Sequence, residues 1–388
     1  MAIINRITDL QDEIVAWRHD LHAHPELLYD VHRTAASVAE KLKAFGCDDV
    51  VSGLGRTGVV GVIRGRKGNS NKVIGLRADM DALPIEEATD LPYKSTVPGK
   101  MHACGHDGHT AMLLGAARYL TETRNFDGTA VVIFQPAEEG GAGGKAMVDD
   151  GMMERFGIGE VYGMHNYPGM PVGHFGLRPG VQMAAADFFN IDIEGVGGHG
   201  AWPHTTIDSI LIGSQIHTLL QSIVSRNVNP VEAAVVSVCM FHAGSSHNAI
   251  PQTAQLRGTA RSLAPQVRDL VEKRIREIVD GVAKLHGAKV NLDYRRGYPM
   301  LENHAAQSEF AVSVAAEVAG KDKVNAALDP VMSAEDFAYM LNSRPGAYIF
   351  VGNGQSAELH HPAYNFNDEA IPFGTSYWVK LVETALPG

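Results

Sequence analysis

The sequence predicts an α/β protein in which an α/β/α domain with a mixed sheet is interrupted by a smaller, ferredoxin-like α+β domain. Three observations predict this fold class. Helix and strand patterns alternate through residues 1–186, the order becomes β-α-β-β-α-β through residues 187–296, and the first pattern returns in residues 297–388. We therefore expect one domain made of residues 1–186 and 297–388, with residues 187–296 inserted as a second domain.

The first domain is expected to begin with two helices. Apolar residues recur at helical spacing from Ile7 to Leu21, and a second helix over residues 33–45 ends at Gly46. Three histidines follow the first pattern at the helix end, where the negative end of the helix dipole favours such side chains; metal binding is the alternative for them. These histidines are His19, His22 and His24.

Short apolar runs bounded by turn residues predict the strands of the first domain. They lie at residues 59–64, 73–78, 129–134 and 161–164, with a turn at 67–71 between the first two. A helix with a buried face is expected after His109, and a short helix after the glycine-rich residues 140–144. The C-terminal part adds a helix near 305–319 and a strand at 347–351.

The inserted domain has its own alternating pattern. Its strands are expected at residues 188–194, 235–242, 253–261 and 289–295, and its helices at 208–225 and 266–285. A glycine-rich loop at 195–200 follows its first strand. This order of elements is the ferredoxin-like supersecondary unit.

Composition excludes several classes of protein. The chain has 388 residues, of which 45% are hydrophobic and 20% charged, which is ordinary for a globular protein. A net charge of −11 without a basic stripe argues against nucleic acid as a partner. The longest apolar run, residues 233–241, is too short to span a bilayer, and residues 1–13 contain no signal-peptide core. Three widely spaced cysteines imply no disulfide framework, so we expect a cytoplasmic protein.

The segment His102–His109 concentrates metal-binding chemistry. It contains one thiol, three imidazoles and one carboxylate within eight residues. Deprotonated cysteine and neutral histidine are preferred ligands of zinc and similar metals. Because the following residues read as a helix, we expect Cys104 and His106 on a loop that leads into it.

Further polar residues follow predicted strands. Asp79 ends one strand, the pair Glu138–Glu139 follows another, and His165 ends a third. Residues at the carboxyl ends of strands form the sites of open α/β sheets. Adjacent glutamates point in different directions, so one can bind metal while the other acts as a general base. Stabilisation of a helix N-terminus by the acidic pair is the alternative.

Several motifs together resemble a known family. The chain is similar to the metallo-amidohydrolases of the aminoacylase and carboxypeptidase G type, in the branch with hippurate hydrolase, N-acyl-amino-acid amidohydrolase and the auxin-conjugate hydrolases. The motifs that carry this resemblance are Leu76–Pro84, Met101–His109, Gln135–Gly140, Gly163–Asn166, Gly197–His204, Met332–Phe337 and Leu359–Pro362. The resemblance implies a metallo-hydrolase catalytic domain and an inserted dimerisation and lid domain.

The resemblance also implies a site with two divalent metal ions per subunit, as zinc, manganese or cobalt. Its implied ligands are Cys104, His106, Glu139, His165 and His360. His361 competes with His360 for the last position, and Glu138 is the implied general base. Asp79 is implied as an orienting carboxylate. Other branches carry histidine at the position of Arg77, which leaves the identity and occupancy of the metals open.

In the inserted domain, the resemblance implies three functional residues. His199 reaches the partner subunit's site and stabilises the oxyanion, while Asn248 and Arg261 hold the substrate carboxylate. A homodimer or a dimer-based tetramer follows from these roles.

The expected activity is hydrolysis of the amide bond of an N-acyl amino acid, either hippurate-like or N-acetylated, with release of a carboxylic acid and a free amino acid. The same chemistry on N-acetyldiaminopimelate or on dipeptides is one alternative. A catalytically silent homologue that binds metal or ligand is the other.

Overall fold

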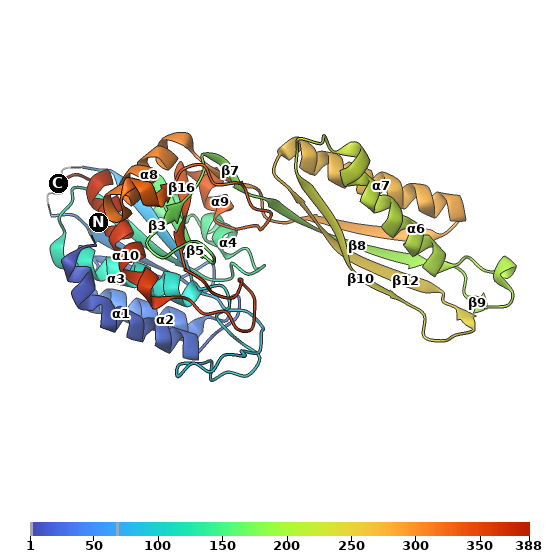
Figure 1. The fold of residues 1–388 in the computed structure, drawn as a ribbon, viewed down its shortest axis with the longest axis horizontal. Coiled ribbons are helices and arrows are strands. Elements are labelled where there is room, and N and C mark those ends of the chain that lie inside the picture. Colours follow the sequence, from blue (N-terminus) through green and yellow to red (C-terminus); the bar gives the residue numbers. More distant parts are fainter. Residues whose placement is uncertain (1–2, 67–69) are drawn as a thin grey trace. The chain divides into compact units, whose positions relative to one another are not determined.

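The computed structural model describes residues 3–66 and 70–388, and it divides the chain into two compact units. The first comprises Met1–Gln182, Glu302–Asp329 and Asp336–Gly388, and the second comprises Met183–Leu301 and Pro330–Glu335 (Figure 1). The mixed α/β fold class predicted from the sequence is confirmed. Residues 67–69 of the expected turn lie outside the described residues.

A mixed eight-stranded sheet forms the centre of the first unit. Its strand order is β1-β2-β4-β3-β5-β16-β6-β15. The four central strands β4, β3, β5 and β16 run parallel, whereas β1 and β2 pair antiparallel at one side. The strands are β1 (Asp49–Leu54), β2 (Gly58–Arg64), β3 (Val73–Asp79), β4 (Thr129–Gln135), β5 (Glu160–Tyr167), β6 (Phe175–Gly176), β15 (Val324–Asn325) and β16 (Gly346–Gly352).

Both faces of this sheet are buried, which explains why its strands read as continuous apolar runs. In β4, Ala130, Val132 and Phe134 belong to a large core cluster shared with the helices. Val131 and Ile133 are equally buried, and because side chains alternate along a strand they point to the opposite face. The sheet is therefore the middle layer of an α/β/α arrangement.

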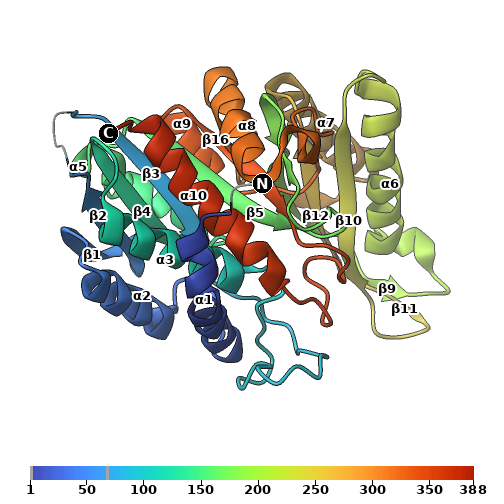
Figure 2. The ribbon, with the colours of Figure 1, turned by 60° about the vertical axis from the view of Figure 1, so that its left-hand side comes forward.

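Long helices cover the face with the large core cluster (Figure 2). They are α1 (Asn5–Ala23), α2 (His32–Phe45), α3 (His106–Thr123), α8 (Ala305–Ala319) and α10 (Ile371–Ala385). Helix α3 packs against α1, α2 and α10, and it lies over β3, β4 and β5. The shorter helices are α4 (Gly143–Asp149), α5 (Met152–Arg155) and α9 (Ala338–Ser343), of which α4 packs on β4 and α9.

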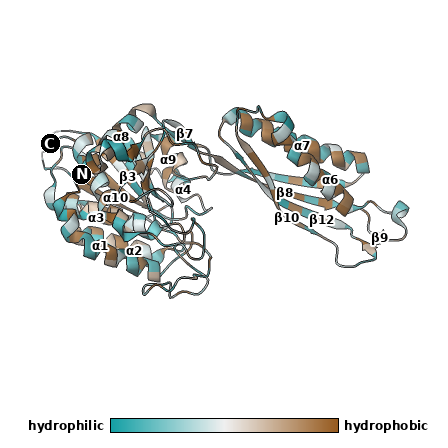
Figure 3. Cartoon of the chain, viewed as in Figure 1, coloured by the Kyte–Doolittle hydropathy of each residue, from teal (hydrophilic) through white to brown (hydrophobic). Residues whose placement is uncertain are grey.

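The second unit contains an antiparallel four-stranded sheet with the order β10-β12-β8-β13 and two long helices. The elements are β8 (Ala185–Glu194), α6 (Ser209–Ser222), β10 (Ala234–Ala243), β12 (Thr253–Ser262), α7 (Pro265–His286) and β13 (Lys289–Arg296). Helices α6 and α7 bury an apolar face against the sheet, and both carry hydrophobic and hydrophilic residues in Figure 3. This sequence of elements and this strand order are ferredoxin-like.

Two small ladders complete the described structure. In the second unit, β9 (Gly198–His199) pairs antiparallel with β11 (Ala249–Ile250). A separate two-stranded sheet joins β7 (Gly180–Met183) and β14 (Leu301–Asn303). Within the described residues, no helix has the length and apolar character needed to cross a membrane.

The second unit is larger than the expected insertion at 187–296. Residues 330–335 belong to it because the Ala184 amide donates to the carbonyl oxygens of Val331 at 3.1 Å and Ser333 at 2.9 Å. These two bonds attach a segment that is distant in sequence, and a local reading of strand patterns cannot detect them.

Candidate metal centre

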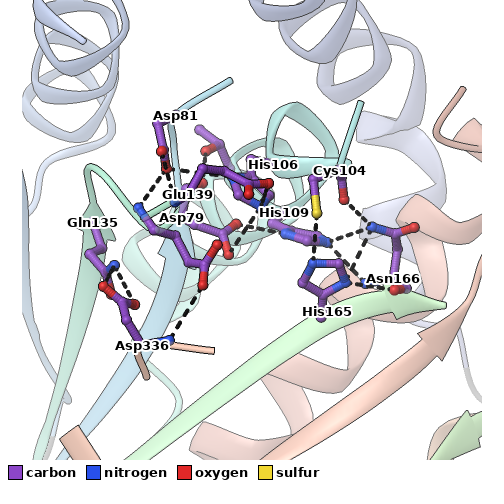
Figure 4. A network of polar contacts seen from close by, with 12 residues as sticks. Asp79, Asp81, Cys104, His106, His109, Gln135, Glu139, His165, Asn166 and Asp336 are labelled. Atoms are coloured by element: carbon purple, nitrogen blue, oxygen red, sulfur yellow. Dashed lines mark hydrogen bonds and ion pairs between the residues drawn. The ribbon is translucent and has the colours of Figure 1, made fainter. Parts of the chain in front are cut away.

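The site lies where three parallel strands of the first unit end. Strands β4, β3 and β5 are neighbours, so their carboxyl ends meet at one edge of the sheet. Asp79 is the last residue of β3, and His165 lies near the end of β5 (Figure 4). The Glu138–Glu139 pair follows β4 at the same edge. Asp79, Glu138 and His165 are buried.

The loop before α3 brings Cys104 and His106 to the same edge. Gly105 has a φ of 89°, a left-handed conformation that favours glycine. A Cβ atom at this position would collide with the side chain of Asn166, so a larger residue would displace the loop. The sharp turn at Gly105 lets α3 start at His106, two residues after Cys104.

His360 arrives from a loop after β16 and is fixed through its backbone. Its amide donates to the carbonyl oxygen of Ala103 at 2.7 Å, and its φ is 66°. Its Nε2 lies 3.2 Å from Oε1 of Glu139. The neighbouring His361 instead accepts from the Ala363 amide through Nδ1 at 3.0 Å. The geometry therefore favours His360 over His361 as a ligand.

Distances within the cluster suit a metal ion. Cys104 Sγ lies 3.4 Å from His165 Nε2, and His106 Nε2 lies 3.9 Å from Glu139 Oε1. Tetrahedral zinc with bonds of about 2.0–2.3 Å separates its ligand atoms by roughly 3.3–3.8 Å. Both ring nitrogens of His106 are buried and have no hydrogen-bond partner among the described residues. An ion between these side chains would satisfy Nε2, while Nδ1 faces Asp81 Oδ1 at 3.6 Å.

The protonation of these groups also points to a cation. Burial and then the charges of Glu139 and Glu138 raise the pKa of the Cys104 thiol well above its usual value. Burial lowers the pKa of His106, but Asp79 and Asp81 outweigh it and raise this pKa to about 10. A bound cation would replace the protons that both groups otherwise keep at neutral pH. Burial lowers the pKa of His165 well below its usual value, which leaves a neutral imidazole ready to bind metal.

Asp79 is held by neighbours on both oxygens. Its Oδ1 lies 2.7 Å from His109 Nδ1, and its Oδ2 accepts from Arg77 Nη1 at 2.8 Å. The second nitrogen of His109 accepts from the Asn166 amide at 2.9 Å, so His109 donates to Asp79 through Nδ1. This arrangement is compatible with an orienting carboxylate, and this role of Asp79 stays a prediction.

Arg77 links three side chains beside the site. Its buried guanidinium donates to Asp79, to Gln135 Oε1 at 2.9 Å and to Asp336 Oδ1 at 3.1 Å. Gln135 also donates to Asp336 at 2.7 Å. Arg77 therefore ties the ends of β3 and β4 to a distant segment and places a positive charge beside the site.

The sequence analysis assigned no individual role to four residues around the ligands: Arg77, Asp81, His109 and Asn166. One signal was available, since Arg77 is the charged residue inside an otherwise apolar strand. Asn166 Nδ2 donates to the Cys104 carbonyl oxygen at 2.7 Å, and its own carbonyl oxygen accepts from His165 Nδ1 at 2.6 Å. It thus connects the segments that carry Cys104 and His165.

The three residues expected to act from the inserted domain lie in the second unit. His199 is in β9 and Asn248 directly precedes β11, so the short ladder keeps them close in space. Asn248 Oδ1 accepts from Ser246 at 2.8 Å. Arg261 is half-buried on β12, and its guanidinium lies 5.7 Å from the ring of Phe188. The roles of these residues stay predictions.

The histidines at the end of α1 need a different explanation from the helix dipole. His22 is buried, with Nδ1 at 2.8 Å from Asp107 and Nε2 at 3.3 Å from Glu87. Arg18 donates to the same Asp107 at 3.0 Å. Asp107 follows His106 directly, so this buried network anchors the ligand loop to α1. His19 instead contacts Asp368 at 2.8 Å.

Because of this network, we expect the protein to lose stability as the pH becomes alkaline. Burial lowers the pKa of His22, but its bonds to Asp107 and Glu87 outweigh burial and raise this pKa to about 9. A pKa raised on folding stabilises the protein fully below the unfolded value near 6.5, and this contribution is lost as pH rises through 9. Urea unfolding from pH 6.5 to 10 is expected to show a loss on the order of 3 kcal/mol. The His22→Gln variant should lack this part of the decline; parallel pH profiles of variant and wild type would contradict the assignment.

A cluster of Cys, His and Glu side chains that could hold a metal ion, beside a second buried glutamate at the carboxyl edge of a mixed sheet, is the arrangement expected of a metal-dependent hydrolase. Comparisons with known proteins agree. Residues 75–384 match the peptidase family M20/M25/M40. The chain therefore belongs to this family.

Individual relatives cover almost the whole chain. A hippurate hydrolase of Campylobacter jejuni is 44% identical over 381 residues, which cover 98% of each chain. An N-acetylcysteine deacetylase of Bacillus subtilis is 37% identical over 96% of this chain and 97% of its own length. The crystal structure of a dinuclear metal-binding peptidase of the M20 family from Bacillus subtilis superposes with a TM-score of 0.83 at 33% identity, covering 98% of this chain and 99% of that one.

Proposed function

We propose that this protein hydrolyses the amide bond of N-acyl amino acids with hippurate-like or acetyl acyl groups. The observation that carries the proposal is the convergence of the five predicted ligand side chains with Glu138 at one edge of the sheet. The relatives named as a hippurate hydrolase and an N-acetylcysteine deacetylase support this substrate class. A cytoplasmic location stays part of the proposal.

Two divalent ions, as zinc, manganese or cobalt, would be held by the cluster of five ligands. They are Cys104, His106, Glu139, His165 and His360. When bound, such ions lower the pKa of a water molecule and polarise the amide carbonyl. Asn166 orients the His165 ring through its backbone carbonyl oxygen and holds the backbone of Cys104 through its side chain, while Asp79 holds His109 beside the ligands.

Glu138 would act first as the general base and then as the general acid. Its carboxylate takes a proton from the attacking water and returns it to the nitrogen of the departing amino acid. The Asp336 amide lies 3.4 Å from Glu138 Oε1 and helps to fix the position of this carboxylate. The products are a carboxylic acid and a free amino acid.

A homodimer or dimer-based tetramer forms part of the proposal. Strand β10 is an edge of the sheet in the second unit, and its residues Met240 and Phe241 are exposed. Helix α6 packs beside β10 and exposes Leu211 and Leu219. An unpaired edge next to exposed apolar side chains favours association with a second copy. In such an assembly His199 would stabilise the oxyanion in the partner's site, and Asn248 and Arg261 would bind the substrate carboxylate.

A substrate panel tests the proposed function. Chelated protein should release no amino acid from hippurate or N-acetyl amino acids, and zinc, manganese or cobalt should restore release from at least one of them. N-acetyldiaminopimelate and dipeptides form the second arm, because an N-acetyldiaminopimelate deacetylase is 37% identical to this chain. Metal-loaded protein that hydrolyses no member of the panel would support the silent homologue instead.

A further inference from the structure

We propose that Asp81 is a positioning residue that holds the turn carrying Glu138 and Glu139 and so gives the two side chains different contacts at the metal centre. The proposal rests on the function proposed above and adds a residue to it. Asp81 is two residues beyond the end of β3 and is 1% exposed. It is not one of the five side chains predicted to bind metal.

Both oxygens of Asp81 are occupied by backbone donors of the glutamate pair. The Glu138 amide donates to Oδ1 at 2.9 Å, and the Glu139 amide donates to Oδ2 at 3.1 Å. Figure 4 shows Asp81 on the side of the cluster opposite His165. Hydrogen bonds from backbone amides to an ionised carboxylate are among the stronger ones in proteins.

Two consecutive amides can reach one carboxylate only if the backbone turns. In an extended strand, successive amides point in opposite directions. Here the turn begins at Ala137, whose φ is 54°, a conformation that costs an alanine roughly 1 kcal/mol or more. The Asp81 carboxylate compensates for this cost by binding both amides that follow.

The turn separates the two glutamate side chains. Glu138 Oε1 lies 3.4 Å from the Asp336 amide, whereas Glu139 Oε1 lies 3.2 Å from His360 Nε2. Glu139 therefore contacts the predicted ligand His360, whereas Glu138 contacts the backbone at Asp336. One oxygen of each carboxylate lies within 4.8 Å of a His106 ring nitrogen. Without the turn, Glu138 and Glu139 would no longer hold separate positions as general base and metal ligand.

Asp81 also faces the ring of a third residue. Its Oδ1 lies 3.6 Å from His106 Nδ1, while Nε2 on the other side of that ring lies 3.9 Å from Glu139 Oε1. A carboxylate behind a metal-binding imidazole fixes the orientation of the ring. The Asp81 side chain thus orients the proposed base Glu138 and two predicted ligands, Glu139 and His106.

Substitution of Asp81 by asparagine tests this role with almost no change in shape. The amide oxygen can accept from one backbone N–H, but its NH₂ group opposes the other. We expect kcat to fall about 10- to 100-fold with KM within about threefold of wild type and two metal ions retained per subunit. The absorption spectrum of the cobalt-substituted protein should also change, because the orientation of His106 and Glu139 changes.

Asp208→Asn is the matched control. Asp208 Oδ1 accepts from the amides of Ile210 at 2.9 Å and Leu211 at 3.1 Å at the start of α6 in the second unit. The Asp208→Asn substitution should leave kcat and the cobalt spectrum unchanged. Asp81→Glu keeps the charge and two acceptors, and should restore part of kcat. If Asp81→Asn does not fold, the kcat and cobalt spectrum of Asp81→Glu test the positioning role instead.

An unchanged kcat and cobalt spectrum in Asp81→Asn would overturn the proposal. Loss of metal in parallel with activity would overturn it as well, because Asp81 would then be a ligand. The cobalt spectrum separates this test from that of the proposed function, since it needs no substrate. If wild type hydrolyses no substrate but the cobalt spectrum of Asp81→Asn differs from that of wild type, the proposed function is refuted and the positioning role of Asp81 is supported.

Discussion

Replacement of Glu138 by glutamine is expected to lower kcat by at least 10²-fold while the protein keeps its metal. General acid–base catalysis contributes typically 10²- to 10⁴-fold, and an amide side chain cannot accept the proton of the attacking water. Glutamine preserves the size of the buried side chain, so packing should be unaffected. Steady-state kinetics on the best substrate of the panel, together with elemental analysis, would measure both quantities.

Glu139→Gln is the internal comparison. Because Glu139 Oε1 faces His360 and His106, this variant should lose metal affinity as well as activity. The two glutamates are adjacent in sequence, so a general disturbance of the loop would affect both variants alike. If Glu138→Gln keeps activity within about tenfold of wild type, or loses metal as Glu139→Gln does, Glu138 is not the base.

Arg77→Met is expected to destabilise the protein by about 3–5 kcal/mol. The guanidinium is fully buried and pairs with Asp79 at 2.8 Å and Asp336 at 3.1 Å. Removal of one partner from a buried ion pair leaves uncompensated charge in the interior, which costs this amount. Urea unfolding of wild type and variant, each in its metal-free form, measures the difference without a contribution from bound ions.

An exposed arginine provides the control. Arg33 lies 2.7 Å from Asp20, and 40% and 45% of the two side chains are accessible. Water and salt screen such a pair, so Arg33→Met should cost less than about 1 kcal/mol. Similar losses for the two variants would show that the Arg77 cluster adds no stability beyond that of a surface pair.

The sequence was sufficient for the central strands and for the edge at which the polar residues gather. Strands β2, β3, β4 and β5 are apolar runs whose bounds are clear because both faces of the sheet are buried. Since β3, β4 and β5 run parallel, residues that follow them must meet at one edge. Asp79, Glu138 and His165 could be placed together for this reason.

The surroundings of the ligands could not be predicted in the same way. Arg77 contacts Asp336, which is 259 residues away, and His22 contacts Asp107 across 85 residues. No periodic pattern connects such pairs, and a buried charge looks like an exposed one in the sequence. Strands β6 and β15 have two residues each and are too short to produce a pattern.

The order of strands in the main sheet has a consequence for synthesis of the chain. Strand β16 lies between β5 and β6, yet it follows the whole second unit in sequence. At ribosomal rates of about 5–20 residues per second, β5 waits roughly 10–40 s for this neighbour. During this interval the second unit can complete its own antiparallel sheet, whereas β5 presents a buried apolar edge without its partner. Nascent chains at this stage expose the kind of edge that chaperones bind and that other chains can extend.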